Sequence, residues 1–344
     1  MPYQTSANTA HAGDPSTVLH TLSNTTPAAA RRFATRHPDV RFFMYCREDV
    51  ELSAGAFKKG DAVFFSGTPA PTRAPAADLI VKSYMMTGYS VTDRPGTLSD
   101  LGCYQLSDGT PLFDIAILYA GSIIGEADAP QITLSSYVTS ILDTSAVSEL
   151  QNQGIVVLLS FAGSYQAAGW SCCPTSQVAA SLAQQMMSIV TQYDLDGIDI
   201  DDEYSTGQTY DDSLIQVVYA FRSLNPYYLV TKALFEDLQY FQASWNGISL
   251  ASILSYGWEM SYGDSDCGGV LSPYVNAGMS SWQLSGGVNA NQSGSPAPLS
   301  NCIVSNGYGG MMVWLVGDAT TDYLSKISNA LYESSTTTPD GCLS

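Results

Sequence analysis

A chain of 344 residues in which 45% are apolar can bury a sizeable core, which excludes global disorder. Its net charge of −19 argues against nucleic acid and anionic membranes as partners, because both require basic surfaces. All three histidines precede residue 76, so chemistry in the larger remaining part must use carboxylates, Tyr, Ser or Cys. We therefore expect no metal ion and no cofactor.

The first 78 residues differ from the rest and are interpreted as an N-terminal extension of unknown role. Residues 27–36 could form a short helix, and residues 41–46 and 61–65 could form strands. The Pro- and Ala-rich stretch 68–78 (TPAPTRAPAAD) indicates a stiff linker, so the predicted catalytic domain covers residues 79–344. The N-terminus lacks the apolar region of a signal peptide, and no apolar run approaches the roughly 20 residues of a membrane span.

After the linker, strand-like apolar segments recur, with helical patterns between several of them. Eight such segments are found, at 81–90, 113–123, 154–163, 195–203, 227–234, 253–262, 279–285 and 309–316. The clearest helical pattern has Thr175 or Ser176 as its N-cap and places Val178, Leu182, Met186 and Ile189-Val190 on one face. Two further helices are predicted over residues 211–225 and 321–334. Alternating strands and helices indicate a parallel sheet, and eight strands in about 250 residues fit an α/β fold, the (β/α)8 TIM barrel. An open doubly wound sheet is disfavoured, because no G-x-G-x-x-G follows the first strand.

The segment LDGIDIDDE (195–203) combines strand-like alternation with a row of acids. Asp199, Asp201 and Glu203 share one face of the predicted strand, while isoleucines occupy the other. In a barrel the isoleucines would pack on the helices and the acids would point inward. Like charges confined in one site cannot all ionise, so at least one pKa rises. Glu203, at the carboxyl end of the strand, is therefore the candidate general acid.

A glutamic acid without histidine or metal most often cleaves a glycosidic bond. The usual mechanisms need two carboxyl groups on opposite sides of that bond, which acids on one face of one strand cannot easily provide. A sugar with a 2-acetamido group can supply its own nucleophile, since its carbonyl oxygen can attack C1 and form an oxazolinium ion. Asp201 would then hold the acetamido N–H and stabilise the positive charge.

The segment Asp196–Glu203 resembles the D-G-x-D-x-D-x-E signature of glycoside hydrolase family 18. Residues 158–163 (LLSFAG), 260–264 (MSYGD) and 311–314 (MMVW) resemble three further strands of that family, although Ala162 replaces a glycine and Gly263 is inserted before Asp264. The order Asp-Asp-Glu-Tyr that ends the signature is similar to that of the endo-β-N-acetylglucosaminidases of the endoglycosidase H and F type. The resemblance covers roughly residues 80–335.

This resemblance implies roles for individual residues. Glu203 would be the acid/base, Asp201 would orient the acetamido group, and Asp199 would share a proton with Asp201. Tyr262 would hydrogen-bond the attacking carbonyl, and Trp314 would lie beneath the sugar at the cleaved position. The further substrate-binding candidates are Met260, Tyr204, Gly163 and the loop residue Trp170, which could stack on a distal mannose; Asp264 is a possible contact.

The expected activity is hydrolysis of the GlcNAc-β1,4-GlcNAc bond in the core of N-glycans, with retention of configuration. The alternatives are a chitinase with the same mechanism and a family 18 lectin that binds sugar without cleaving it. The expected partner is the N-glycan of a glycoprotein, the expected state is a monomer, and a secreted location is favoured. Among the seven cysteines, Cys267 and Cys302 could pair, and the odd number leaves at least one thiol free.

Overall fold

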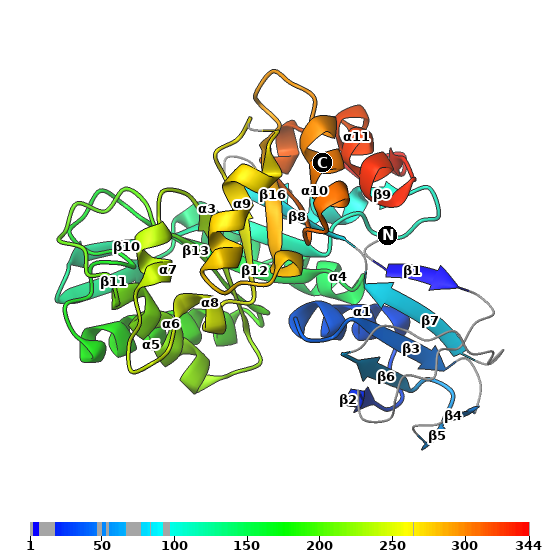
Figure 1. The fold of residues 1–344 in the computed structure, drawn as a ribbon, viewed down its shortest axis with the longest axis horizontal. Helices are drawn as coiled ribbons and strands as arrows, with labels where there is room; N and C mark the ends of the chain where they lie inside the picture. The colour runs from blue at the N-terminus through cyan, green and yellow to red at the C-terminus, as the bar shows by residue number, and fades with distance from the viewer. Residues whose placement is uncertain are drawn as a thin grey trace.

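The computed structural model describes residues 3–6, 18–46, 50–52, 55–66, 77–82, 84–91, 97–263 and 265–343. Its larger part is a closed barrel of eight parallel strands surrounded by helices, as predicted (Figure 1). The barrel strands, in order around the barrel, are β8 (Met85–Val91), β10 (Ile115–Glu126), β12 (Val156–Gly163), β13 (Gly197–Asp201), β14 (Leu229–Leu234), β15 (Tyr256–Glu259), β16 (Leu284–Asn289) and β17 (Gly310–Trp314). A ninth strand, β11 (Ala129–Thr133), adds antiparallel to β10.

The helices outside the barrel follow the strands in chain order. They are α2 (Thr97–Asp100), α3 (Ser136–Leu142), α4 (Ala146–Asn152), α5 (Ser176–Gln192), α6 (Ser213–Leu224), α7 (Leu238–Gln242), α8 (Leu250–Ile253), α9 (Cys267–Asn276), α10 (Ala297–Asn306) and α11 (Thr321–Tyr332). The three predicted helices of this region correspond to α5, α6 and α11 and are confirmed. In α5, the hydroxyl of Thr175 accepts a hydrogen bond from Val178 N, and Leu182, Met186 and Val190 form the buried stripe.

Strand β13 has the alternation that the sequence predicts. Ile198 and Ile200 lie in the outer core, which also contains the apolar faces of α5 and α6. Asp199 and Asp201 lie on the opposite face and point into the barrel. All five residues of the strand are buried. The same interior contains a cluster of buried apolar and aromatic side chains, namely Met85, Tyr89, Ile115, Ile117, Val156, Leu158, Leu229, Ala233, Tyr256, Trp258 and Met312.

The seventh predicted strand is displaced. Its prediction covered residues 279–285, whereas β16 begins at Leu284, after a single 3-10 turn over Ser281–Gln283. The strand contains Gly286 and Gly287, which lie beyond the end of the predicted segment. A Cβ atom at Gly287 would lie 1.9 Å from the carbonyl oxygen of Glu259, so the close approach of two backbones requires a glycine there.

The residues before the barrel form a second sheet. Its five antiparallel strands have the order β1 (Tyr3–Ser6), β7 (Ala77–Lys82), β3 (Phe42–Cys46), β6 (Ala62–Phe65) and β2 (Val18–Leu22). The predicted helix 27–36 is α1 (Pro27–Arg36), and a small hairpin joins β4 (Val50–Leu52) to β5 (Gly55–Phe57). Together, α1 and these strands are called the N-terminal unit below.

The predicted boundary at residues 78 and 79 falls inside β7. Residues 81 and 82 belong to the N-terminal unit, and the first barrel strand begins at Met85, so the single strand predicted over 81–90 is in fact divided between two sheets. The apolar residues 79–81 precede β8 closely in the sequence and extend its apolar pattern. The sequence therefore showed no break between the two strands. Of the predicted linker, residues 68–76 lie outside the described residues.

The N-terminal unit packs against the amino ends of the barrel strands through α1, which lies between its sheet and the barrel (Figure 1). Arg32 of α1 forms an ion pair with Asp196, the residue before β13, at 2.8 Å. The Tyr256 hydroxyl donates to Thr35 O at 3.0 Å, and the guanidinium of Arg41 lies over the ring of Trp282. The opposite end of the barrel, where the strands finish, remains uncovered by this unit.

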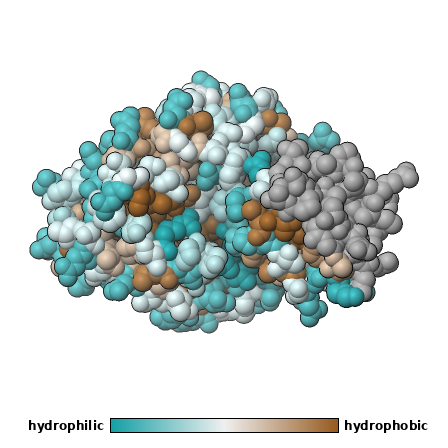
Figure 2. Space-filling view, turned by 60° about the horizontal axis from the view of Figure 1, so that its bottom comes forward, coloured by the Kyte–Doolittle hydropathy of each residue, from teal (hydrophilic) through white to brown (hydrophobic). Residues whose placement is uncertain are grey.

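Two disulfides link distant segments. Cys267–Cys302 joins α9 to α10, as the sequence allowed, and Cys103–Cys342 ties the C-terminus to the segment after α2. Cys46, Cys172 and Cys173 are free and buried. None of the helices in the described part of the chain is long and apolar enough to cross a membrane. The face drawn in Figure 2 is mostly polar, with apolar residues in small separate patches.

Candidate active site

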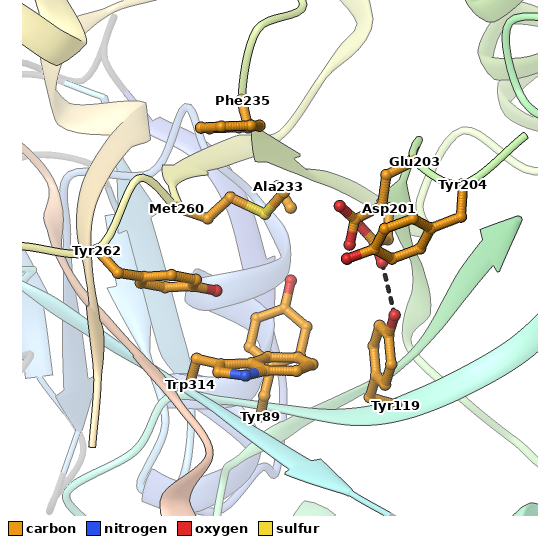
Figure 3. Close-up of a pocket in the computed structure, with 10 residues that line it drawn as sticks. All are labelled: Tyr89, Tyr119, Asp201, Glu203, Tyr204, Ala233, Phe235, Met260, Tyr262 and Trp314. Carbon is orange, nitrogen blue, oxygen red and sulfur yellow. Dashed lines mark hydrogen bonds between the residues drawn. The ribbon is translucent and has the colours of Figure 1, made fainter. Parts of the chain in front are cut away.

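A pocket of about 230 Å³ opens at the carboxyl ends of the barrel strands (Figure 3). Its wall combines aromatic rings with two carboxyl groups, a composition typical of pockets that bind small ligands. The lining residues are Tyr89, Tyr119, Asp201, Glu203, Tyr204, Ala233, Phe235, Met260, Tyr262 and Trp314. They come from the ends of β8, β13, β14 and β17, from the middle of β10 and from the segments that follow β13, β14 and β15.

Six of the nine predicted site residues meet in this pocket: Asp201, Glu203, Tyr204, Met260, Tyr262 and Trp314. Asp201 and Glu203 stand on one side, and the hydroxyl of Tyr262 points toward them from the other, with the ring of Trp314 along the floor (Figure 3). Asp199 lies deeper, fully buried beneath Asp201 in the barrel. Gly163 and Trp170 are outside the lining.

Burial and like charge act together on Asp201. Desolvation and the neighbouring charge of Glu203 raise its pKa to about 7, against the hydrogen bond that Tyr119 donates to Asp201 Oδ2 at 2.8 Å. Burial also raises the pKa of Glu203, although hydrogen bonding with Tyr204 and Asp201 offsets part of this shift. Near neutral pH, this pair of carboxyl groups can therefore hold a proton and donate it.

Asp199 has a different surrounding. Its carboxyl group accepts hydrogen bonds from the hydroxyls of Tyr89 at 2.7 Å, Ser160 at 2.9 Å and Thr231 at 2.7 Å. Full burial raises its pKa, and these three donors work in the opposite direction. Its proposed exchange of a proton with Asp201 stays a prediction.

The aromatic residues of the pocket support one another. The rings of Tyr89 and Tyr119 meet the Trp314 ring edge-on, with centroids 5.2 and 4.8 Å away. Tyr204 and Tyr262 have left-handed backbone conformations, with φ of 61° and 47°. Such conformations are uncommon for bulky residues and gather at functional sites.

Two predicted contacts are corrected. Trp170 is fully buried, and its indole N–H donates to Phe161 O at 2.7 Å, so it supports the loop after β12 from inside and cannot stack on a sugar. Gly163 packs against the catalytic segment instead of lining the pocket, because a Cβ atom there would lie 2.4 Å from Glu203 O. Asp264, a possible contact, lies outside the described residues.

Four lining residues were not predicted from the sequence: Tyr89, Tyr119, Ala233 and Phe235. Tyr89 lies near the carboxyl end of the first barrel strand, and Tyr119 of the second pairs with Val91, the last residue of that first strand. A signal for them existed, since polar aromatic residues at such positions reach the site in a barrel of this kind. Phe235 follows β14 and is 45% exposed, and nothing in its sequence surroundings marks it.

Comparison with known proteins places the chain in a family. No family model matches it. A protein of Flavobacterium sp. (strain SK1022), named endo-β-N-acetylglucosaminidase, is 30% identical over 250 residues, which cover 68% of this chain and 76% of that protein. The chain belongs to the endo-β-N-acetylglucosaminidases of glycoside hydrolase family 18. Endo-β-N-acetylglucosaminidase F1 of Elizabethkingia meningoseptica is 25% identical over 271 residues, 74% of this chain and 78% of that one.

The fold of this endo-β-N-acetylglucosaminidase is also found in solved structures. The structure of EndoBT-3987 from Bacteroides thetaiotamicron with a Man5GlcNAc product has a TM-score of 0.63 at 18% identity and covers 97% of this chain and 90% of its own. A putative chitinase A from Streptomyces coelicolor has a TM-score of 0.55 at 17% identity and covers 73% of this chain and 99% of its own. The larger coverage of the first shows that its likeness extends into the N-terminal unit.

Proposed function

We propose that this enzyme hydrolyses the β1,4 bond between the two GlcNAc residues at the core of N-linked glycans. One GlcNAc would stay on the protein, and the released glycan would retain its anomeric configuration. The name of the 30% identical relative supports this reaction. EndoBT-3987, which shares the fold, has been solved with a Man5GlcNAc product and a Man9GlcNAc2Asn substrate.

The observation that carries the mechanism is the position of the two carboxyl groups. Asp201 and Glu203 are two residues apart, on one side of the pocket, and both have raised pKa values. A mechanism with two opposed carboxyl groups would need the second one across the sugar, where the structure has Tyr262 and Trp314 (Figure 3). This arrangement favours a nucleophile that the substrate brings.

In the first step, the acetamido carbonyl oxygen attacks C1 and the C1–O glycosidic bond breaks. Glu203 gives its proton to the departing oxygen, and the sugar becomes an oxazolinium ion. Asp201 accepts the acetamido N–H and balances the positive charge, while Tyr262 donates its hydroxyl to the carbonyl oxygen. In the second step, water attacks C1 and opens the ring, and the carboxylate of Glu203 takes the proton from that water.

The remaining pocket residues would bind the substrate. The Trp314 ring forms a flat apolar floor, suited to the face of a GlcNAc ring, and Met260 lies above it (Figure 3). Tyr204, which is 50% exposed, stacks on Tyr165 at 5.2 Å between ring centroids and would contact the part of the glycan that leaves the pocket. Asp199 would hold Asp201 in place from below.

Incubation of the protein with a high-mannose glycopeptide and, in parallel, with chitin oligomers tests the function. Mass spectrometry should show the peptide keeping a single GlcNAc, and NMR of the fresh product should show retained configuration. Cleavage of chitin oligomers alone would favour the chitinase alternative. Binding without cleavage of either would favour the lectin, and an inverted product would contradict the mechanism.

We also propose that the protein acts outside the cell as a monomer. Its two disulfides, Cys103–Cys342 and Cys267–Cys302, support an oxidising compartment. Alkylation of the protein from culture medium, followed by mass spectrometry, should find these four thiols protected. Size-exclusion chromatography with light scattering should give a mass near 36.7 kDa.

A further inference from the structure

A buried lysine lies next to the acidic end of β13. Lys232 of β14 is 1% exposed and pairs in register with Ile200 of β13. Its neighbours along the strand, Thr231 and Ala233, face the barrel, so Lys232 starts on the side of the helices. Its ammonium group then reaches the carboxyl end of the strand, where it donates to Ala233 O at 2.7 Å and forms an ion pair with Asp237.

The charges around this ammonium group are mostly negative. Asp237, in the segment before α7, contacts it directly, and the charges of Asp202 and Asp201 at the end of β13 act on it electrostatically. Asp237 also accepts a hydrogen bond from the Tyr274 hydroxyl of α9 at 2.7 Å. The charge of Glu259 in β15 contributes to a raised pKa of Tyr274. Burial and the charge of Asp202 also raise the pKa of the Cys172 thiol.

Burial by itself would lower the pKa of Lys232, yet the carboxylates of Asp237 and Asp202 raise it, so the lysine is charged. The positive charge lowers in turn the pKa values of Asp199, Asp201, Asp202 and Glu203. Four carboxyl groups within five residues would otherwise retain more protons, because burial and mutual repulsion both favour their neutral forms.

We propose that Lys232 is a positioning residue for the reaction: its buried charge acts through the protein so that Asp201 and Glu203 together keep one proton at neutral pH. This inference rests on the proposed function. The reaction needs a protonated Glu203 beside an Asp201 able to balance positive charge, and two protons on the pair would remove that ability. Lys232 supplies the balance without contact with the substrate, since it faces away from the pocket that Ala233 lines.

The test compares the pH dependence of kcat/KM in four variants. Lys232→Met removes the charge and keeps the volume, so both limbs of the profile should move to higher pH by about one unit. Lys232→Arg keeps the charge and should keep the wild-type profile. Asp237→Asn removes a negative charge from the same ion pair and should move the profile slightly in the opposite direction. A purely structural role predicts lower melting temperatures and an unmoved profile.

The variant Lys232→Met leaves Asp237 buried without its partner and can fail to fold. The double variant Lys232→Met/Asp237→Asn has no uncompensated charge there and should show the upward shift in reduced size, since Lys232 acts on Asp201 and Glu203 more directly. Wild-type profiles for both the double variant and Asp237→Asn, in folded protein, would overturn the proposal.

Failure of the proposed function can be told apart from failure of this inference. If the wild type cleaves chitin oligomers and no glycopeptide, the profiles are measured on chitin oligomers. If it cleaves neither, NMR titration of labelled Asp and Glu carboxyl carbons gives the pKa values directly. Upward shifts for Asp201 and Glu203 in the double variant support the role of Lys232 in both cases, and unmoved values contradict it.

Discussion

The two ends of β13 carry acids of the same signature in opposite surroundings. At the amino end, Asp196 is fully buried, and its carboxyl group has several hydrogen-bonded and charged partners. Arg32 donates from Nε and Nη2 at 3.0 and 2.8 Å, and Arg36 lies 3.3 Å away. Val157 N and the amide of Gln151 complete the set at 3.0 and 3.3 Å. Two guanidinium groups from the N-terminal unit thus match one carboxylate.

At the carboxyl end, four carboxyl groups have one nearby lysine, which is itself paired with Asp237. Their negative charge is not matched, and the pKa of Asp201 rises to about 7. Positively charged side chains thus lie beside the acid that only holds strands together. The acids that must exchange a proton have less positive charge near them. The surrounding charge, more than the residue type, separates the two roles.

The largest effect is expected from Glu203→Gln. Glutamine keeps the shape of the side chain but cannot give its proton to the departing oxygen, so kcat should fall by about 10³-fold or more. Stopped assays on a high-mannose glycopeptide measure the loss. The control Glu126→Gln, at an exposed position on β10, should keep full activity. Cleavage by Glu203→Gln at the wild-type rate would remove Glu203 from the mechanism.

Asp201→Asn should reduce kcat by about 10²-fold, because a neutral amide cannot balance the charge of the oxazolinium ion. A change mainly in kcat would show that Asp201 acts in the transition state, whereas a change in KM alone would limit it to binding. Tyr119→Phe is the milder companion variant, since it removes only the hydrogen bond to Asp201 Oδ2.

The wild type should lose activity as pH rises above about 7. Asp201 has a pKa of about 7 and that of Glu203 is raised too, so above this pH the pair loses the proton that the departing oxygen requires. On the basic limb, kcat/KM should fall about tenfold per pH unit. A profile that stays flat to pH 9 would show that no shared proton limits the reaction.

At the amino end, Arg32→Gln should affect stability and leave the chemistry unchanged. The substitution removes a two-pronged contact with a buried carboxylate, and Arg36 compensates only in part, so the free energy of unfolding should fall by about 2 kcal/mol or more. Chemical denaturation measures this loss. The variant Arg32→Gln/Asp196→Asn should lose less than the sum of the single variants, because the unpaired charge is gone. A changed pH profile in Arg32→Gln would mean that the two ends of β13 are coupled.

The alternation in residues 195–203 and the succession of strands and helices were sufficient to predict the barrel and its inward-facing acids, whereas Tyr204, Met260, Tyr262 and Trp314 were named only from the resemblance to glycoside hydrolase family 18. Local patterns gave no sign of the contact between Arg32 and Asp196, which are 164 residues apart. Residues 286 and 287 fell outside the predicted strand 279–285, because the feature that requires Gly287, the backbone of Glu259, lies on a neighbouring strand. Trp170 was misjudged for a similar reason, since a loop sequence does not show whether its tryptophan turns inward.

The smallest effect is expected from Tyr204→Phe. The hydroxyl of Tyr204 hydrogen-bonds Glu203 and thereby lowers the pKa of that carboxyl group, so its removal should raise this pKa by a few tenths of a unit, about the effect of a single weak hydrogen bond. The basic limb of the pH profile should move upward by the same amount, with kcat changed only a few-fold. Tyr204→Ala should in addition raise KM, because the ring stacked on Tyr165 is lost. If Tyr204→Phe moved the limb downward, the hydroxyl would be favouring the neutral form of Glu203, and the description of this end of β13 as short of positive charge would need revision.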